Sequence, residues 1–187
     1  MTVLNLKTPL QSSQRQAIFI FFLIFLCSAV VLIGGLKSQV AVGDEIHHYR
    51  FAKHCFLQNG RAVFDSVYGK ADYPAVLYTT DSAWPLGLAF VWRLFGHVSF
   101  PLAQIYQTGF YILSVFATYL ATREIHGAKP ALWSAFLAAT LPMVVSFGIL
   151  FYTDLPATAF IVFSFWFFLR KKYFWAGVTA AVQFLMK

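Results

Sequence analysis

Long apolar stretches alternate with short polar segments along the chain, at the spacing of membrane helices. A helix that crosses the hydrocarbon core of a bilayer needs about 20 apolar residues, and the first such run, residues 17–36, carries no charge. The pattern predicts an all-α polytopic membrane protein with about four to five transmembrane helices. The predicted spans cover residues 17–36, 98–122, 131–151, 155–169 and, incompletely, 173–187.

The first apolar run has the properties of an uncleaved anchor. A secretory signal peptide has a shorter apolar core and a small-residue cleavage site, whereas no A-x-A-like site follows Leu36. Gly34 and Gly35 near its end are typical of a helix that stops there, although two small residues would also permit close helix packing. We therefore predict that this run stays in the protein as its first membrane helix.

A polar loop, residues 37–97, separates the first two spans and holds five of the seven acidic residues of the chain. Within it, residues 46–57 carry apolar side chains at helical spacing, and residues 85–95 form an apolar segment too short to span. Trp84, just before the second segment, and Trp92 and Arg93 within it are residue types that favour a membrane interface. Both segments are predicted to be helices that lie along the membrane surface.

Composition agrees with a membrane protein. Apolar and aromatic residues make up 59% of the 187 positions and charged residues 11%, whereas a soluble domain is about 25% charged. This excludes a soluble enzyme, a disordered chain and a disulfide scaffold, since Cys27 and Cys55 offer no framework. The net charge of +7 sits between apolar runs, so membrane topology explains it better than nucleic-acid binding.

The short basic turns set the orientation. Arg123 with Lys129, and the cluster at residues 170–172, fall on the same side as the basic N-terminus, and the positive-inside rule makes that side cytoplasmic. One outward crossing then delivers Asp44, and a return with a second outward crossing delivers Asp154. Both acids are predicted on the non-cytoplasmic face.

Asp44 and Glu45, soon after the first span, are candidate catalytic carboxylates. Partial desolvation near lipid raises the pKa and the basicity of a carboxylate, and such a group takes a proton from an acceptor hydroxyl. The structural interpretation is that Asp44 caps a surface helix that begins at Glu45. The two roles are compatible.

Asp154 has the same two interpretations. In the segment Y-T-D-L-P it suits an N-cap, with Pro156 in the first helical turn. An ionised group deep in the bilayer is costly, so a position at the tip of a helical hairpin is expected either way. Because Thr153 offers a cap without a full charge, the sequence favours a functional role for Asp154.

A metal site is the less favoured interpretation of the nearby histidines. Zinc accepts carboxylate and imidazole ligands, and His47, His48 and His54 follow the acid pair closely. The order D-E-I-H-H, however, matches neither H-E-x-x-H nor a known inverse, and adjacent histidines do not share a helix face. We predict no required metal or cofactor. The chain has no Gly-rich loop that would bind the phosphates of a nucleotide. If the carboxylates activate an acceptor hydroxyl for sugar transfer, the activated sugar is therefore expected to arrive attached to a lipid and not to a nucleotide.

Two motifs and their spacing resemble the GT-C membrane glycosyltransferases. D-E-I-H-H-Y at residues 44–49 follows the first span, and F-Y-T-D-L-P at residues 151–156 lies at the later tip. Similar proteins include the aminoarabinose and lipopolysaccharide-core sugar transferases, the protein O-mannosyltransferases and the dolichyl-phosphate-glucose glucosyltransferase of N-glycan assembly. The resemblance covers residues 17–187, as an N-terminal portion of a GT-C-like domain.

The resemblance implies sugar transfer from a polyprenyl-phosphate carrier to a glycan, lipid or protein acceptor at the non-cytoplasmic face of the membrane. It makes Asp44 the acceptor-activating base, with Glu45 and Asp154 as supporting or positioning groups, and His48, Tyr49 and Tyr152 as substrate-binding residues. The chain departs from its relatives at two places that concern binding of the lipid phosphate. Many relatives have a Lys-Pro-Pro-like segment before the second span, where this chain has Ala83-Trp84-Pro85. Relatives often carry an arginine in the second span, where this chain has a stretch with Gln104 and Gln107. The phosphate-binding candidates by charge are Lys70, Arg93 and Arg50.

Two other functions remain open. Family members usually have twice as many spans or more, so the chain is expected to be an N-terminal part or a truncated form of such a glycosyltransferase. One alternative is a non-catalytic membrane subunit or a gene remnant. A transporter is the other, although transporters place ionisable groups near the bilayer midplane. The expected location is a bacterial inner membrane with a periplasmic site, or alternatively the endoplasmic reticulum with a lumenal site.

Overall fold

The computed structural model describes residues 12–38, 44–57 and 83–186, and within these ranges the side chains of residues 12, 13, 15, 16, 38 and 44–47 are left aside. The described residues form eight α-helices and no strand. Their bounds are α1 (Ser12–Ser38), α2 (Asp44–Leu57), α4 (Ala83–Phe95), α5 (Phe100–His126), α6 (Ala128–Thr140), α7 (Pro142–Ile149), α8 (Asp154–Leu169) and α9 (Tyr173–Met186). The all-helical prediction is confirmed for this part of the chain.

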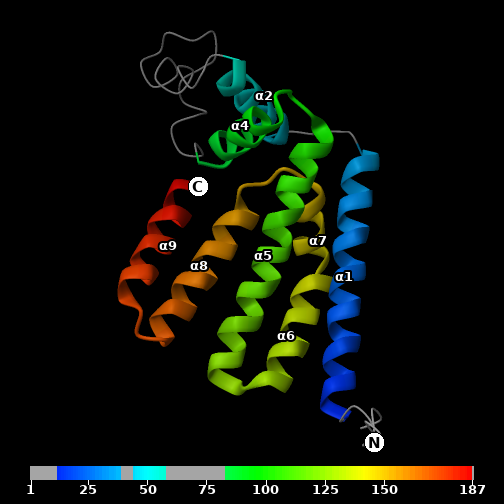
Figure 1. Ribbon diagram of the computed structural model, residues 1–187, viewed down its shortest axis with the longest axis vertical. Helices are drawn as coiled ribbons and strands as arrows, with labels where there is room; N and C mark the ends of the chain where they lie inside the picture. Colours follow the sequence, from blue (N-terminus) through cyan, green and yellow to red (C-terminus); the bar gives the residue numbers. More distant parts are fainter. Residues whose placement is uncertain (1–11, 39–43, 58–82, 187) are drawn as a thin grey trace, which may run out of the picture.

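Helices α1, α5 and α6 run roughly along the long axis, α8 and α9 slant beside α5, and α2 with α4 lies across one end (Figure 1). The central helix is α5, which contacts α1, α6, α7 and α8. The turns from α5 to α6 and from α8 to α9 lie at the end where α1 begins, whereas the turn from α7 to α8 lies in the half near α2 and α4 (Figure 1). The sequence predicted this placement, with both basic turns at the end where the first helix begins and the tip that carries Asp154 at the other end.

The helices of the first loop are present where apolar spacing predicted them. The segment 46–57 falls within α2, which begins slightly earlier, at Asp44, and the segment 85–95 falls within α4. The two helices pack on each other, and α4 also contacts α5 and α9. A position along a membrane surface stays a prediction.

Helix α5 is longer than the predicted span 98–122. Ser99 is its N-cap, with Oγ accepting a hydrogen bond from the Leu102 amide, and Pro101 occupies the first turn. The polar residues that were predicted to form a turn instead extend the helix to His126, where Arg123 and His126 interact favourably with the helix dipole. Gly127 ends it at φ 83°, a left-handed conformation that suits glycine.

The predicted span 131–151 is not one continuous helix. It is divided into α6 and α7, which meet at an angle of 58°. Pro142 causes the break, because proline supplies no amide hydrogen for the helix and pushes the preceding residue to extended geometry. Leu141 accordingly has φ −59° and ψ 123°.

The glycine pair of the first span serves packing, and the prediction that it ends the helix was wrong. Helix α1 continues through Gly34 and Gly35 to Ser38. A Cβ at Gly35 would overlap the side-chain amide of Gln104, and one at Gly34 would lie 3.2 Å from Ile149. The two glycines therefore let α1 approach α5 and α7 closely.

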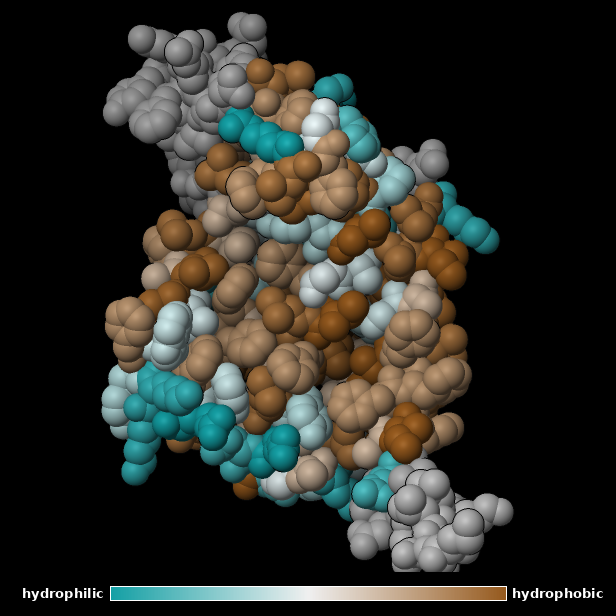
Figure 2. All heavy atoms as spheres, in the orientation of Figure 1, coloured by the Kyte–Doolittle hydropathy of each residue, from teal (hydrophilic) through white to brown (hydrophobic). Residues whose placement is uncertain are grey.

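The surface has the character expected of a membrane protein. Figure 2 shows hydrophobic side chains over most of the helical body and hydrophilic ones gathered at one end and over α2. Among the described helices, the segment Ala17–Lys37 is long and apolar enough to cross a membrane alone, and α6 with α7 meets the criterion as one bent span. Helices α8 and α9 are apolar but have 16 and 14 residues, so the predicted four to five spans stay a prediction.

Candidate functional site

The first motif forms the beginning of α2. Asp44 and Glu45 are the first two residues of this helix, where acidic residues interact favourably with the helix dipole. The side chains of both residues are outside the described part of the structure, and so is the whole of Lys70. Their predicted roles therefore rest on sequence, and the described residues nearest to them in the motif are His48 and Tyr49.

Helix α2 is fixed to α4 along its C-terminal half. Phe51 and Cys55 are buried against Ala89, and Arg93 Nη2 donates a hydrogen bond to the Cys55 carbonyl oxygen at 3.3 Å. Burial raises the pKa of the Cys55 thiol to about 11, against a smaller opposing effect of the Arg93 charge. The predicted phosphate candidate Arg93 is thus an exposed cation that also bridges two helices.

Tyr49 brings the first motif against the second. Its ring stacks on Phe151 with centroids 5.9 Å apart and an interplanar angle of 20°, and it meets Trp92 edge-on at 5.2 Å. Phe151 is 2% exposed and also contacts Trp84 and Phe100. Aromatic pairs at such distances are attractive beyond their buried area. Burial raises the pKa of the Tyr49 hydroxyl above its ordinary value.

A buried glutamine connects this aromatic cluster to the turn between α7 and α8. Gln107 Oε1 accepts a hydrogen bond from Trp84 Nε1 at 2.9 Å. Its Nε2 donates to the carbonyl oxygens of Phe147 at 2.7 Å and Tyr152 at 3.1 Å. Gln107 therefore joins α4, α5 and the residues that lead into Asp154.

This role of Gln107 was missed by sequence reasoning, which noted the residue only as a departure from a membrane arginine. Gln104, one helical turn earlier, behaves similarly and donates from Nε2 to the Gly148 carbonyl oxygen at 3.0 Å. Both side chains are fully buried. The signal in the sequence was two glutamines at i and i+3 in an apolar run, which is typical of hydrogen bonds between membrane helices.

Asp154 is the first residue of α8, and its predicted place as the N-cap was wrong. Thr153 precedes the helix in that place, with helical dihedral angles and no capping bond from its side chain. Asp154 is half-buried in the first turn, where its charge suits the helix dipole. Pro156 lies in the first turn, as predicted, where proline is tolerated because the first amides of a helix have no partner within the helix, and it is buried there.

Two further predicted substrate-binding residues lie beside these groups. Tyr152 is half-buried in the turn before Asp154, and its ring lies 5.2 Å from that of Phe147. His48 meets the buried Trp84 edge-on at 6.1 Å. The structure thus places His48 and Tyr49 against one aromatic cluster, made of Trp84, Trp92, Phe100 and Phe151, and it connects Tyr152 to Trp84 of that cluster through Gln107.

Among the described residues, no three His, Cys, Asp or Glu side chains come together as a metal-binding group. The side chains of Asp44, Glu45 and His47 are outside that description. The expectation that no metal is required stays a prediction.

The sequence profile of the DIE2/ALG10 family matches residues 77–187, more than half of the chain. The chain belongs to the DIE2/ALG10 family. ALG10 is a dolichyl-phosphate glucosyltransferase of the GT-C type, so the family confirms the resemblance to GT-C glycosyltransferases and identifies a membrane glycosyltransferase. The matched residues include Arg93, Tyr152 and Asp154, whereas the first motif precedes them.

No curated protein and no solved structure shows a significant similarity to this chain.

Proposed function

We propose that this protein transfers a sugar from a polyprenyl-phosphate carrier to a glycan, lipid or protein acceptor, at the end of the molecule formed by α2, α4 and the turn between α7 and α8. The contact between Tyr49 and Phe151 carries this proposal, because it joins the helix that begins with Asp44 to the turn that precedes Asp154. Two motifs far apart in the sequence are thereby part of one cluster. Membership of the DIE2/ALG10 family supports a dolichyl-linked donor.

The reaction requires a base and a place for an anionic leaving group. The acceptor hydroxyl oxygen bonds to the anomeric carbon while the bond from that carbon to the phosphate oxygen breaks, and polyprenyl phosphate leaves. Asp44 is the proposed base that takes the hydroxyl proton, and such a group accelerates transfer by about 10²–10⁴-fold. Glu45 and Asp154 are the proposed groups that position donor and acceptor.

The phosphate of the carrier needs cations at the same end. Arg93 is exposed and fixed beside the C-terminal turn of α2 by its bond to Cys55. Arg50 and Lys53 are also exposed on α2, and Lys53 adds a cation that sequence reasoning did not select. Together with Lys70, these residues are candidates to hold the phosphate, while His48, Tyr49 and Tyr152 are candidates to contact the sugar or the acceptor.

The family favours one of the two expected locations. ALG10 is a protein of the endoplasmic reticulum, and this supports a lumenal site and dolichyl phosphate as the carrier rather than a periplasmic site and undecaprenyl phosphate. Glucose is the sugar to test first, because it is the one that ALG10 transfers. The bilayer is the remaining partner, and nucleic acid is not part of the proposal.

The test is a transfer assay with the purified full chain in detergent, synthetic dolichyl-phosphate glucose and candidate acceptors. We expect Asp44→Asn to lower the transfer rate about 10²–10⁴-fold, since an amide takes no proton. Asp154→Asn should lower it as well. Glu124→Gln is the matched control, because Glu124 is an exposed acid at the opposite end, 3.7 Å from Arg170, and it should keep full activity.

Full transfer by Asp44→Asn would remove Asp44 from the role of base. Loss of activity in Glu124→Gln to the same degree would show a general effect of acid removal instead of a site. If no polyprenyl-linked sugar supports transfer in the wild-type chain, the non-catalytic alternative gains. The transporter alternative receives little support, since Glu124 is exposed and Asp154 half-buried, and these are the acids whose side chains the structure describes.

A further inference from the structure

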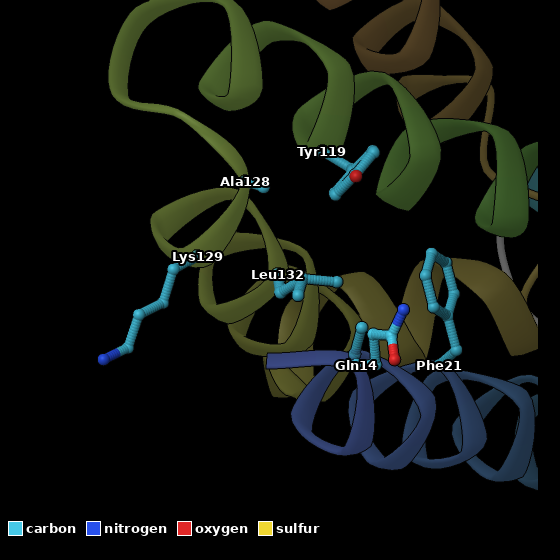
Figure 3. Close-up of a pocket in the computed structure, with 7 residues that line it drawn as sticks. Gln14, Phe21, Tyr119, Ala128, Lys129 and Leu132 are labelled. Atoms are coloured by element: carbon cyan, nitrogen blue, oxygen red, sulfur yellow. The ribbon is translucent and has the colours of Figure 1, made fainter. Parts of the chain in front are cut away.

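A hollow lies between α1, α5 and α6 at the end of the molecule opposite the proposed active site. Its volume is about 290 Å³, and Phe21, Tyr119 and Leu132 line it, one from each helix. Figure 3 shows these three side chains directed toward one another, with Gln14 beside them, while the Lys129 side chain extends away from the hollow. The interior is therefore apolar and the rim carries a cation.

A second hollow of about 140 Å³ continues the first toward the middle of the bundle. The two share Phe21 and Tyr119, whose ring centroids are 6.1 Å apart. The deeper hollow is lined by apolar side chains in addition to Tyr119, among them Ile24, Ile112 and Ala135. Together they form a narrow apolar groove that runs from the basic end along α1 and α5.

Positive charge concentrates at the open end of this groove. The Arg123 guanidinium lies 5.9 Å from the centroid of the Tyr119 ring, and Lys129 lines the mouth. Both side chains are exposed. Glu124, the described acid at this end, lies 3.7 Å from Arg170. The Arg123 guanidinium thus already lies beside Tyr119, whereas the Lys129 side chain, which is directed away from the hollow in Figure 3, would turn about its side-chain bonds to meet a phosphate at the mouth.

We propose that this groove binds one anionic phospholipid of the adjacent leaflet, with its phosphate between Arg123 and Lys129 and one acyl chain along Phe21 and Tyr119. Large apolar side chains that line the groove are exposed, including Phe21, Ile112 and Phe116, so the groove opens toward the hydrocarbon of the bilayer. Basic pockets between helices on the cytoplasmic side are suited to anionic head groups. A bound lipid would fill the space between α1 and its neighbours.

This inference rests on the membrane location of the family and is independent of the sugar-transfer reaction. Native mass spectrometry of the full chain in detergent tests it, with phosphatidylglycerol and phosphatidylcholine of identical acyl chains titrated in parallel. We expect tighter binding of phosphatidylglycerol. The double variant Arg123→Gln with Lys129→Gln should weaken its binding by about fivefold for each charge removed, and should leave phosphatidylcholine binding unchanged.

The matched control is Lys171→Gln with Lys172→Gln, which removes two exposed cations from the other turn at the same end. This control should bind phosphatidylglycerol like the wild type. Equal weakening in both double variants would mean diffuse attraction to surface charge and would overturn the proposal. Equal affinity of the wild-type chain for the two lipids would overturn it as well.

A second variant tests the acyl-chain half of the site. Ala17 lines the groove, and Ala17→Trp would fill it without altering charge. With a phosphatidylglycerol that carries a diazirine in its acyl chain, the wild type should be labelled on α1, α5 and α6 near Phe21 and Tyr119, and Ala17→Trp should lose most of this labelling. A thermal unfolding profile like that of the wild type shows that the variant is folded, and unchanged labelling in such a variant would refute the groove as the site.

Discussion

The two ends of this molecule are held together by different interactions. At the α2–α4 end, buried groups form hydrogen bonds between elements. The Trp92 Nε1 atom donates to the Ser99 carbonyl oxygen at 2.9 Å, and Gln107 connects Trp84 to the turn before Asp154. At the opposite end, the described interactions between turns include the pair of Arg170 and Glu124, whose side chains are 46% and 40% exposed.

This difference indicates where the geometry of the molecule is most precisely fixed. A buried indole N–H or side-chain amide that loses its partner pays the full cost of desolvation, so only one arrangement is favourable. An exposed ion pair contributes about 0–1 kcal/mol and tolerates rearrangement. The well-fixed end is the one that carries both motifs, and a fixed geometry there is what the proposed transfer between two substrates would require.

The largest expected effect comes from Phe151, at the centre of the aromatic cluster. Phe151→Ala should lower the free energy of unfolding by about 3–5 kcal/mol, because it leaves a cavity among Tyr49, Trp84 and Phe100. Phe168→Ala is the control toward the opposite end, where the side chain is 58% exposed, and it should cost much less. Denaturant unfolding in detergent compares them, and equal losses would contradict the difference between the two ends.

A smaller effect is expected where α1 meets α5. Gly35→Ala puts a methyl group into the space of the Gln104 side-chain amide, which is fully buried and bonded to Gly148, so we expect a loss of about 1–3 kcal/mol. At Gly177 nothing lies within 4 Å of an added Cβ, and Gly177→Ala should be neutral or slightly stabilising. The two shifts in Tm give the comparison. A stable Gly35→Ala variant would mean that this packing is loose.

The smallest expected effect is a dependence on alkaline pH through Cys55. Its folded-state pKa is raised to about 11, whereas the unfolded thiol has a pKa of about 8.5. As pH rises above about 9, the unfolded chain releases its proton first, so this contribution to stability is present at neutral pH and is lost toward pH 11.

The measurement is Tm between pH 7 and pH 11 for the wild type and for Cys55→Ala. The wild type should lose more stability than the variant over this interval. In a Cys27→Ser background, alkylation of Cys55 should also stay slow until the same pH range. Parallel pH profiles for the two proteins would show that the thiol is not buried between α2 and α4.

The sequence by itself determined the helices and their order along the chain. Charge-free runs, helical spacing in residues 46–57 and the short basic turns are local signals, and they were sufficient because apolar burial and chain breaks act over a few residues. The break at Pro142 belongs to this class as well. Proline inside an apolar run was a readable signal for two helices, although the sequence was interpreted as one span.

Only the tertiary structure decided which residues meet. That Tyr49 stacks on Phe151, that Gly35 accommodates Gln104, and that Gln107 holds the Tyr152 carbonyl are facts about residues distant in sequence. Periodicity shows that a side chain faces inward but not what it faces. The partner is selected by close packing and by the cost of leaving a buried polar group unpaired, and both depend on the whole assembled bundle.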